Sequence, residues 1–526
     1  MIGKCFKEIR FVRLMNYNID AAWHYHNGTK HPHGKLHSSA YFYDPAVRPT
    51  PYKIYTENLQ SINLPLEKKP VGKGTFAAVS DNIKQDEKTI VPDLNTLARI
   101  LYFSNGITKT IHFPRLGDME FRAAACTGAL YHIEIYVVCG DITGLGAGVY
   151  HFDPKEMNLK QLRRGDYRHV LIGASGNDVN VEHAPVILVY TDIFTRNSIK
   201  YQTREYRHGF WDCGVILANT LALSSTHDLP AKVIVGFVDE AVNFLLDLNT
   251  QKEVSLALVP IGFTKKTPTE KIQVQKLNLA TEPLSSYTVD DPEIQAIHQA
   301  SSLATEKEVI EWKEKAIKTT PLGPTKNDVP LDFQVEKEIL QNPIESVIIK
   351  RGSTREFSRQ SISFQQLSAI IYYSTRWVPA DFLRQEYSLV DLYLIVNSVD
   401  GLDSGSYYYN KEQNSLQLLK AGNLRSAAGH LGLDQSLPAD GSVCVFFLSD
   451  LNEVLDKFGN RGYRASELEA STIGGRLYLT SYAQGLGATG LTFYDDEVTQ
   501  FFSPHAKNKS VMFLVAIGKK ARISNT

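Results

Sequence analysis

The sequence predicts an α+β fold that occurs twice in tandem, and two observations carry this prediction. Residues 200–207 (KYQTREYR) match residues 457–464 (KFGNRGYR) at an offset of 257 residues, and the same offset aligns residues 144–150 with residues 401–407. Strand-like apolar runs and helical patterns are mixed without regular βαβ alternation, which is typical of layered α+β domains. Because the matches form several separate blocks, we expect one fold to be duplicated and fused.

The individual elements follow in chain order. Residues 129–138 begin as the end of a helix and continue as an apolar strand, and residues 144–150 place a glycine-containing turn before an aromatic strand. Residues 186–191 and 511–517 are apolar enough for buried strands. Residues 211–225 carry apolar side chains at helical spacing and few polar ones, which predicts a buried central helix.

Three segments are expected from the repeat. We predict a first domain over residues 1–265, a linker over residues 266–330 and a second domain over residues 331–526. The linker is polar and contains Pro, Lys and Glu. Residues 292–318 nevertheless have helical spacing of apolar residues, so the linker should be only partly irregular.

Composition excludes several classes of protein. Lys and Arg total 56 against 57 Asp and Glu, so no broad attraction for nucleic acid or an anionic membrane is expected. No apolar run reaches the roughly 18–20 residues of a membrane helix, and the charged N-terminal segment does not resemble a signal peptide. The five Cys are scattered, which favours a reducing, cytoplasmic location over a disulfide framework.

Two motifs match the patterns of known binding sites, but the residues around them argue against such sites. Gly485-Leu486-Gly487 opens a G-x-G-x-x-G pattern, but a helix is expected before it and a strand after it, which is the reverse of a dinucleotide-binding turn. Five His lie within residues 24–37, without Cys or carboxylates among them. We therefore expect no metal site there.

A third motif, Arg351-Gly-Ser353-Thr-Arg355, has two readings from its residues alone. Two guanidinium groups that flank a hydroxyl match the oxygens of a phosphomonoester. A cluster of this kind is also common in solvated basic turns. The motif precedes a helix that should begin near Ser363.

The order of these motifs resembles the FMN-dependent nitroreductase superfamily. The first copy is similar to its SagB-type, azoline dehydrogenase branch, through residues 25–31 (YHNGTKH), 122–134, 148–153 and 200–207. The resemblance implies two helix-flanked mixed β-sheets. It also implies FMN bound between two subunits, which a tandem chain can reproduce as an intrachain pseudo-dimer.

The two copies retain complementary halves of the site that the resemblance implies. Upstream the offset is 270, so residues 81–85 (DNIKQ) replace Arg351–Arg355 in the first copy, whereas the second copy lacks the Cys126-Thr127-Gly128 segment. The resemblance therefore predicts one FMN site and one lost site. The expected cofactor-binding residues are Arg351, Ser353, Arg355, Gly485, Leu486 and Gly487 from the second copy, and Arg122, Cys126, Thr127 and Gly128 from the first.

The same resemblance implies catalytic roles for Lys200 and Tyr201, which match a pair that takes the substrate proton while hydride passes to flavin N5. We expect the lysine to lower the pKa of the phenol. The plain alternative is a surface aromatic beside a solvated charge.

The function expected from these residues is an FMN-dependent oxidoreductase, a dehydrogenase of azolines or related C–N bonds in a peptide or small molecule. The alternatives are an NAD(P)H-dependent nitro or quinone reductase, and a catalytically decayed scaffold of a biosynthetic complex. Expected partners are the substrate and proteins of such a complex, with neither nucleic acid nor membrane.

Overall fold

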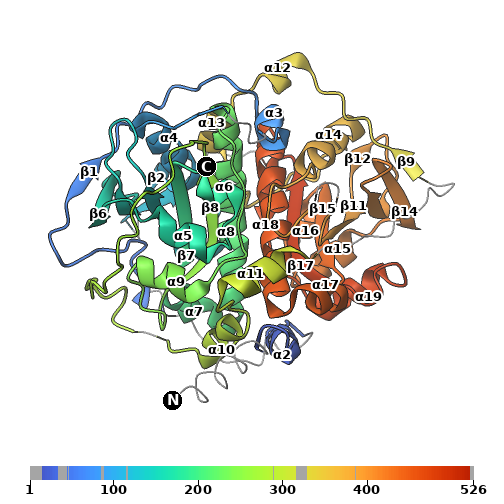
Figure 1. Cartoon of the computed structure of the whole chain (residues 1–526). Helices are drawn as coiled ribbons and strands as arrows, with labels where there is room; N and C mark the ends of the chain where they lie inside the picture. The colour runs from blue at the N-terminus through green and yellow to red at the C-terminus, as the bar shows by residue number, and fades with distance from the viewer. Residues whose placement is uncertain are drawn as a thin grey trace.

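The computed structural model describes residues 15–32, 44, 47–83, 88–113, 117–287, 289–315, 328–384 and 387–521. Two β-sheets, one from each copy, lie on either side of a central pair of long helices (Figure 1). These helices are α8 (Glu205–Thr226) and α18 (Asn460–Ala483), and every residue in both is buried. The predicted tandem α+β fold and the buried central helix are confirmed.

The first sheet has the strand order β1-β6-β5-β4-β7-β8. Its strands are β1 (Ser61–Asn63), β4 (Ile133–Cys139), β5 (Gly148–Asp153), β6 (Asn158–Arg164), β7 (Val186–Asp192) and β8 (Val254–Ile261). The second sheet has the order β16-β17-β15-β11-β13-β14-β9. Its strands are β9 (Asp328–Pro330), β11 (Asp391–Val396), β13 (Gly405–Asn410), β14 (Ser415–Ala421), β15 (Val443–Ser449), β16 (Gly487–Gly490) and β17 (Ser510–Gly518).

All neighbouring strands in these two sheets pair antiparallel. The expectation of mixed sheets is wrong in this detail, because hairpins and helical excursions return each strand in the opposite direction. Outside the sheets, β10 (Ile362–Ser363) pairs in parallel with β12 (Val399–Asp400), and β2 (Ile107–Phe113) forms a hairpin with β3 (Gly117–Arg122).

The helices repeat with the strands. Following β6 and β7, the first copy has α5 (Arg168–Ala174), α6 (Val179–Glu182), α7 (Phe194–Tyr201), η3 (Gln202–Arg204) and, after α8, α9 (Asp239–Leu245). Following β14 and β15, the second copy has α15 (Arg425–Leu431), α16 (Ser436–Asp440), α17 (Leu451–Phe458) and, after α18, α19 (Asp495–Phe502). The remaining helices are α2 (Asp20–Gly28), α3 (Thr75–Ser80), α4 (Leu94–Asn105), η2 (Thr127–Ala129), α10 (Pro292–Ala300), α11 (Glu306–Lys313), α12 (Lys337–Leu340), α13 (Ile344–Lys350) and α14 (Phe364–Ser374). None of the described helices is both long and apolar enough to cross a membrane.

Small residues allow the central helices to approach each other closely. A Cβ on Gly475 would lie 2.7 Å from Ala218 Cβ, and a Cβ on Gly214 would collide with Ser471. Each of these contacts joins a residue to its own counterpart at the 257 offset. The contact therefore lies where a two-fold axis relating the copies would pass, as in an isologous dimer.

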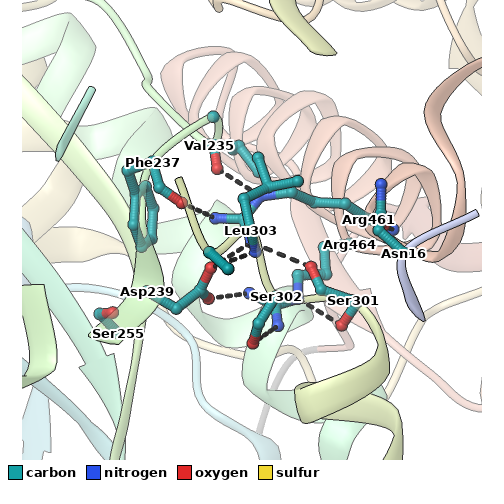
Figure 2. Close-up of polar contacts among 12 residues, drawn as sticks. Asn16, Val235, Phe237, Asp239, Ser255, Ser301, Ser302, Leu303, Arg461 and Arg464 are labelled. Atoms are coloured by element: carbon teal, nitrogen blue, oxygen red, sulfur yellow. Dashed lines mark hydrogen bonds and ion pairs between the residues drawn. The ribbon is translucent and has the colours of Figure 1, made fainter. Parts of the chain in front are cut away.

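Two crossed ion clusters join the copies around this helix pair. Asp239, at the start of α9, binds Arg461 Nη1 at 2.6 Å and Arg464 Nη1 at 2.7 Å (Figure 2). Asp495, at the start of α19, binds the counterpart residues Arg204 at 3.1 Å and Arg207 at 2.6 Å. Each copy thus gives two arginines to a carboxylate of the other.

The N-terminal helix of each copy completes these clusters. Arg207 Nε donates to Thr29 Oγ1 at 3.1 Å, directly after α2, and Arg464 Nε donates to Ser301 Oγ at 2.8 Å, directly after α10. The matching positions are 272 residues apart. The predicted linker therefore contains, in α10, a counterpart of α2, and its last three residues form β9 of the second sheet. The domain boundaries stay a prediction.

Candidate functional site

A cavity of about 510 Å³ lies between the two copies. Its first-copy lining is His31, Ala125, Cys126, Thr127, Gly128, Lys200, Tyr201, Gln202, Arg204, His208, Trp211, Asp212 and Val215. Its second-copy lining is Ser353, Arg355, Leu433, Gln435, Tyr478, Thr489, Gly490, Leu491, Thr492 and Phe513. The volume is within the roughly 300–1,000 Å³ usual for small-molecule and cofactor sites.

One wall of the cavity is the turn that contains Gly128, whose φ is +62°. A Cβ at this position would lie 2.8 Å from Tyr201 Oη and 3.4 Å from Lys200 Nζ. Glycine therefore serves two purposes here: it accepts the left-handed conformation and leaves space for both side chains. The predicted Lys200–Tyr201 pair and the predicted Cys126–Gly128 segment are brought together.

Asp212, on α8, holds this wall from behind. Its carboxylate accepts hydrogen bonds from the Thr127 N–H at 2.8 Å, the Thr127 hydroxyl at 2.9 Å and the Cys126 thiol at 3.0 Å. Burial, with Asp212 beside it, raises the pKa of Cys126 to about 11, so the thiol remains a donor. Sequence reasoning missed Asp212 because 85 residues separate it from Thr127 and it lies in the part of α8 that was predicted only as a buried helix.

His132 connects Asp212 to two further buried carboxylates. Its Nε2 lies 2.8 Å from Asp212 Oδ2, and its Nδ1 lies 2.7 Å from Asp192 Oδ1 and 3.2 Å from Glu205 Oε1. Burial lowers the pKa of His132, but Asp192 and Asp212 raise it well above its usual value, so the imidazole carries a positive charge. Burial and Asp192 raise the pKa of Glu205, which favours its neutral form.

Within the residues that the structure describes, two groups of three side chains in this cluster have the donor atoms to bind a metal ion. The ligand atoms of Cys126, His132 and Asp212 lie within 4.8 Å of one another, as do those of His132, Asp192 and Glu205. The first set is already joined by hydrogen bonds, and the positive charge of His132 opposes ligation by its nitrogens.

The titration of the Lys200–Tyr201 pair differs from expectation. Burial raises the pKa of Tyr201, and Asp212 and Cys126 raise it further. Burial, together with Arg48 and Arg355, lowers the pKa of Lys200. The expectation that the lysine acidifies the phenol is therefore wrong: the phenol keeps its proton, and the amine is the group more readily deprotonated.

The predicted phosphate motif is divided by the fold. Ser353 and Arg355 line the cavity, but Arg351 does not. Arg351 Nε donates to the carbonyl oxygen of Ala123 at 2.7 Å, and its Nη2 donates to that of Arg122 at 3.0 Å. Arg351 therefore ties the second copy to the chain just before the cavity wall.

The Gly485-Leu486-Gly487 segment ends helix α18 and does not line the cavity. Gly485 has φ +74°, the Leu486 N–H donates to Ser481 O at 3.0 Å and the Gly485 N–H donates to Tyr482 O at 3.1 Å, which together form a Schellman cap. Gly487 opens β16 against Thr354 and Lys520. The predicted helix before this motif is confirmed, but the strand expected after it lies within the G-x-G-x-x-G pattern itself, as β16 (Gly487–Gly490). The cavity is lined further along, by residues 489–492.

Arg122 also lies outside the cavity lining. It is buried, with its guanidinium 5.0 Å from the Tyr131 ring centroid and its Nη2 donating to Pro51 O at 2.5 Å. Arg122 therefore supports the chain beside the Cys126–Gly128 segment and does not contact the cavity.

Several cavity residues were not predicted. Arg204 Nε and Nη2, His208 Nδ1 and Thr492 Oγ1 are buried and find no hydrogen-bond partner within the described residues. His31 belongs to the predicted histidine cluster; burial and Arg204 lower its pKa to about 3, so it is neutral. Orphaned polar atoms around a cavity are expected where a polar ligand binds.

The histidine cluster itself is dispersed. His24 pairs at the surface with Glu293, His26 is buried against Tyr463, and His31 lines the cavity. His33 and His37 lie outside the described residues.

Backbone pairing narrows the pseudo-symmetric position. Val233, the counterpart of Gly490, donates its N–H to Pro379 O at 2.8 Å and accepts from the Asp381 N–H at 2.9 Å. Trp312 of α11 packs on Phe458, the counterpart of Tyr201, with ring centroids 5.3 Å apart. Strand-like pairing and a buried indole thus occupy part of this place, and a smaller cavity of about 290 Å³ remains beside them, lined in part by Ile83, Lys232 and Leu383.

Residues 348–519 match the family model described as the nitroreductase family. This part of the chain is a nitroreductase-family domain. The nitroreductase domain runs from α13 through β17, and so contains Arg351, Ser353, Arg355 and the whole second-copy lining of the cavity.

Individual relatives agree with this match. A solved structure of a protein described as a nitroreductase, from Anabaena variabilis ATCC 29413, has a TM-score of 0.75 and 24% identity, and covers 95% of this chain and 99% of that chain. That likeness shows that the fold of both copies occurs together in another single chain. A Methanocaldococcus jannaschii protein named as a nitroreductase is 25% identical over 169 residues, which is 32% of this chain and 80% of the relative.

A third relative is the trifolitoxin-processing protein TfxB of Rhizobium leguminosarum bv. trifolii. It is 28% identical over 164 residues, which is 28% of this chain. The match spans 44% of that relative's own length.

Proposed function

We propose that this chain is an FMN-dependent oxidoreductase with one cofactor site, in the cavity between its two copies. The main support for this proposal is that residues from both copies line one cavity. The first copy contributes residues 126–128, Lys200 and Tyr201, and the nitroreductase domain contributes Ser353 and Arg355. These residues come from three segments far apart in the sequence.

The cavity suits FMN in its chemistry. Ser353 and Arg355 would bind the phosphate through a hydroxyl and a guanidinium, as charge-assisted contacts. Trp211, Tyr478 and Phe513 supply aromatic surface for a planar ring, and the orphaned atoms of Arg204 and Thr492 supply polar contacts. When bound, FMN would supply hydride chemistry at its N5 atom.

The protein's own contribution is proton transfer and orientation. Lys200, whose pKa is lowered, would accept the substrate proton as its neutral amine, and Tyr201 would orient the substrate by donating its phenolic hydrogen. Asp212 would hold the Cys126–Gly128 wall in position beside this pair, since it accepts hydrogen bonds from both Cys126 and Thr127.

The substrate class proposed is an azoline or related C–N bond in a peptide or small molecule. Support comes from the SagB-type resemblance of the first copy and from the similarity to a protein named for processing trifolitoxin. On this basis we propose a cytoplasmic enzyme that works with proteins of a peptide-modifying complex.

Two other functions have specific support. The nitroreductase domain and the Methanocaldococcus relative favour an NAD(P)H-dependent nitro or quinone reductase. The narrowed second position favours a scaffold that has lost catalysis altogether.

One experiment separates these functions and tests the single site. The purified chain is examined for flavin absorbance, and the FMN released on denaturation is quantified against protein. We expect one FMN per chain and anaerobic bleaching of the flavin by an azoline-containing peptide. Bleaching by NADPH alone would favour the reductase, absence of flavin after reconstitution with FMN would favour the scaffold, and two FMN per chain would refute the single site.

A further inference from the structure

The loop between α15 and α16 has an unusual backbone. Leu433 has φ +62° and Asp434 has φ +53°, so two successive non-glycine residues are left-handed. For a leucine this conformation is sterically unfavourable, because its Cβ approaches the carbonyl oxygen. Such outliers persist where the surrounding structure holds them, and they often lie at functional sites.

The first copy makes the same turn with residues that accept it. At the 257 offset, Gly176 has φ +69° and Asn177 has φ +54°. Glycine and asparagine adopt this conformation at little cost. The fold therefore requires the left-handed turn in both copies, and only the second copy places a large side chain on it.

The space around the two turns also differs: there is room for a side chain in the second copy and none in the first. A Cβ on Gly176 would lie 3.0 Å from Ile310 and 3.2 Å from Val309, so α11 leaves no room for a side chain at this residue. In the open position Leu433 and Gln435 line the cavity instead. The side chain is thus present in the copy where there is a cavity for it to enter.

Asp434 is anchored on both sides. Its Oδ1 lies 2.7 Å from His430 Nδ1, and its Oδ2 accepts the Tyr494 hydroxyl at 2.6 Å. His430 Nε2 in turn lies 2.7 Å from Glu497. These contacts hold the backbone of the loop while Leu433 and Gln435, on either side of Asp434, border the cavity.

We propose that Leu433 is a specificity-determining residue, whose strained backbone is retained because its side chain limits the size of the apolar group that the cavity admits. This inference rests on the proposed function, because it concerns which molecule reacts at the same cavity. The chemical class selected is a compact apolar group on the substrate, in place of a bulky or charged one.

The test uses quinones of two sizes as oxidants of the FMN-loaded, dithionite-reduced chain. The reduced flavin gives two electrons and two protons to the quinone, which becomes the hydroquinone. Rate constants for reoxidation are measured by anaerobic stopped flow with p-benzoquinone and with the larger 9,10-phenanthrenequinone. The quantity compared is the ratio of the two rate constants.

Leu433→Gly should raise the rate constant for 9,10-phenanthrenequinone relative to that for p-benzoquinone about tenfold. This is the order of effect that a few methylene groups have in an apolar pocket. The substitution should also raise Tm, because glycine relieves the left-handed leucine. Leu433→Ala should shift the ratio in the same direction without the gain in Tm, since alanine keeps the strain. Asn508→Gly, at an exposed left-handed position (φ +70°) outside the cavity lining, should leave the ratio unchanged.

Two negative results are distinguishable. If both Leu433 variants retain FMN and the wild-type ratio, Leu433 does not select the substrate, and the proposed function is unaffected. If the wild-type chain binds no FMN, the proposed function and this inference both fall.

Discussion

At the scale of single residues, two features define the cavity: the missing Cβ of a glycine, and the pKa changes that burial causes in the neighbouring side chains. Gly128 leaves space for Tyr201 and Lys200, and burial moves their pKa values in opposite directions, up for the phenol and down for the amine. Desolvation disfavours the charged form of each group, so both changes favour neutral side chains. A neutral amine beside a neutral phenol is a competent base and hydrogen-bond donor.

Tyr201→Phe should retain FMN but slow substrate oxidation by about 10²–10⁴-fold, the usual contribution of acid–base assistance. The fold tolerates phenylalanine here, because the counterpart in α17 is Phe458. Lys200→Met should abolish the limb of the pH–rate profile in which rate rises with pH, since that limb reports deprotonation of a lysine whose pKa is lowered. Single-turnover flavin reduction across pH 6–10 is the measurement. Wild-type rates and pH dependence in both variants would exclude the pair from catalysis.

Arg355 and Arg351 should behave differently although they belong to one motif. Arg355→Ala should weaken FMN binding about 10–100-fold, because a charge-assisted phosphate contact contributes about 1.5–3 kcal/mol. Arg351→Ala should instead lower the free energy of unfolding, since it removes the two hydrogen bonds to the carbonyl groups of Arg122 and Ala123.

Flavin titration and urea denaturation of both variants separate the two roles. Equal loss of FMN affinity in both would show that Arg351 also reaches the phosphate.

At the scale of elements, the cavity depends on how closely α8 and α18 approach. Both helices contribute lining residues, Trp211, Asp212 and Val215 from one and Tyr478 from the other. Their contact is set by Gly214 and Gly475, where backbone meets side chain without an intervening Cβ. A wider crossing would move the walls of the cavity apart.

Gly214→Ala should therefore destabilise the chain by about 1–3 kcal/mol through overpacking, because the new Cβ would collide with Ser471 and lie 2.8 Å from Thr472 N. Gly173→Ala is the matched control: Gly173 is also helical, in α5, and nothing lies within 4 Å of its added Cβ. The control should be neutral or stabilise by up to about 1 kcal/mol, through helix propensity alone. Urea denaturation measures both, and equal effects would refute the packing argument.

At the scale of the whole molecule, two crossed ion clusters hold the copies together. Burial alone would raise the pKa of Asp239, but Arg461 and Arg464 lower it to about 2. Burial also opposes ionisation of Asp495, and Arg204 and Arg207 lower its pKa well below the usual range. Each carboxylate has a lower pKa in the folded chain than in the unfolded one. Each therefore stabilises the fold above the unfolded value and loses this effect as pH falls towards the folded value.

Acidification from pH 5 to pH 2 should cost about 2 kcal/mol of stability through Asp239 alone. Asp239→Asn should remove that part of the acid sensitivity. At pH 7 it should destabilise by about 3–5 kcal/mol, because two buried guanidinium groups lose their carboxylate.

The adjacent Glu240→Gln, on an exposed side chain, is the control and should change neither quantity. Unfolding free energies at several pH values are the measurement. An unchanged acid limb in Asp239→Asn would contradict the role of this cluster.

The sequence by itself determined the duplication, the α+β class and the buried central helix. These features depend on local apolar periodicity and on short motifs that recur at a constant offset. Both kinds of signal lie within neighbouring residues. The helix that precedes Gly485 was predictable for the same reason.

Only the tertiary structure decided which residues of a motif face the cavity. Arg351 and Arg355 are four residues apart, yet one binds carbonyl groups of the other copy and the other lines the cavity. Asp212, His132 and Asp192 meet from three separate elements, and their charges follow from burial together, which no single segment reveals. Side-chain direction and desolvation are set by packing between distant segments, and so they become known only when the copies are folded against each other.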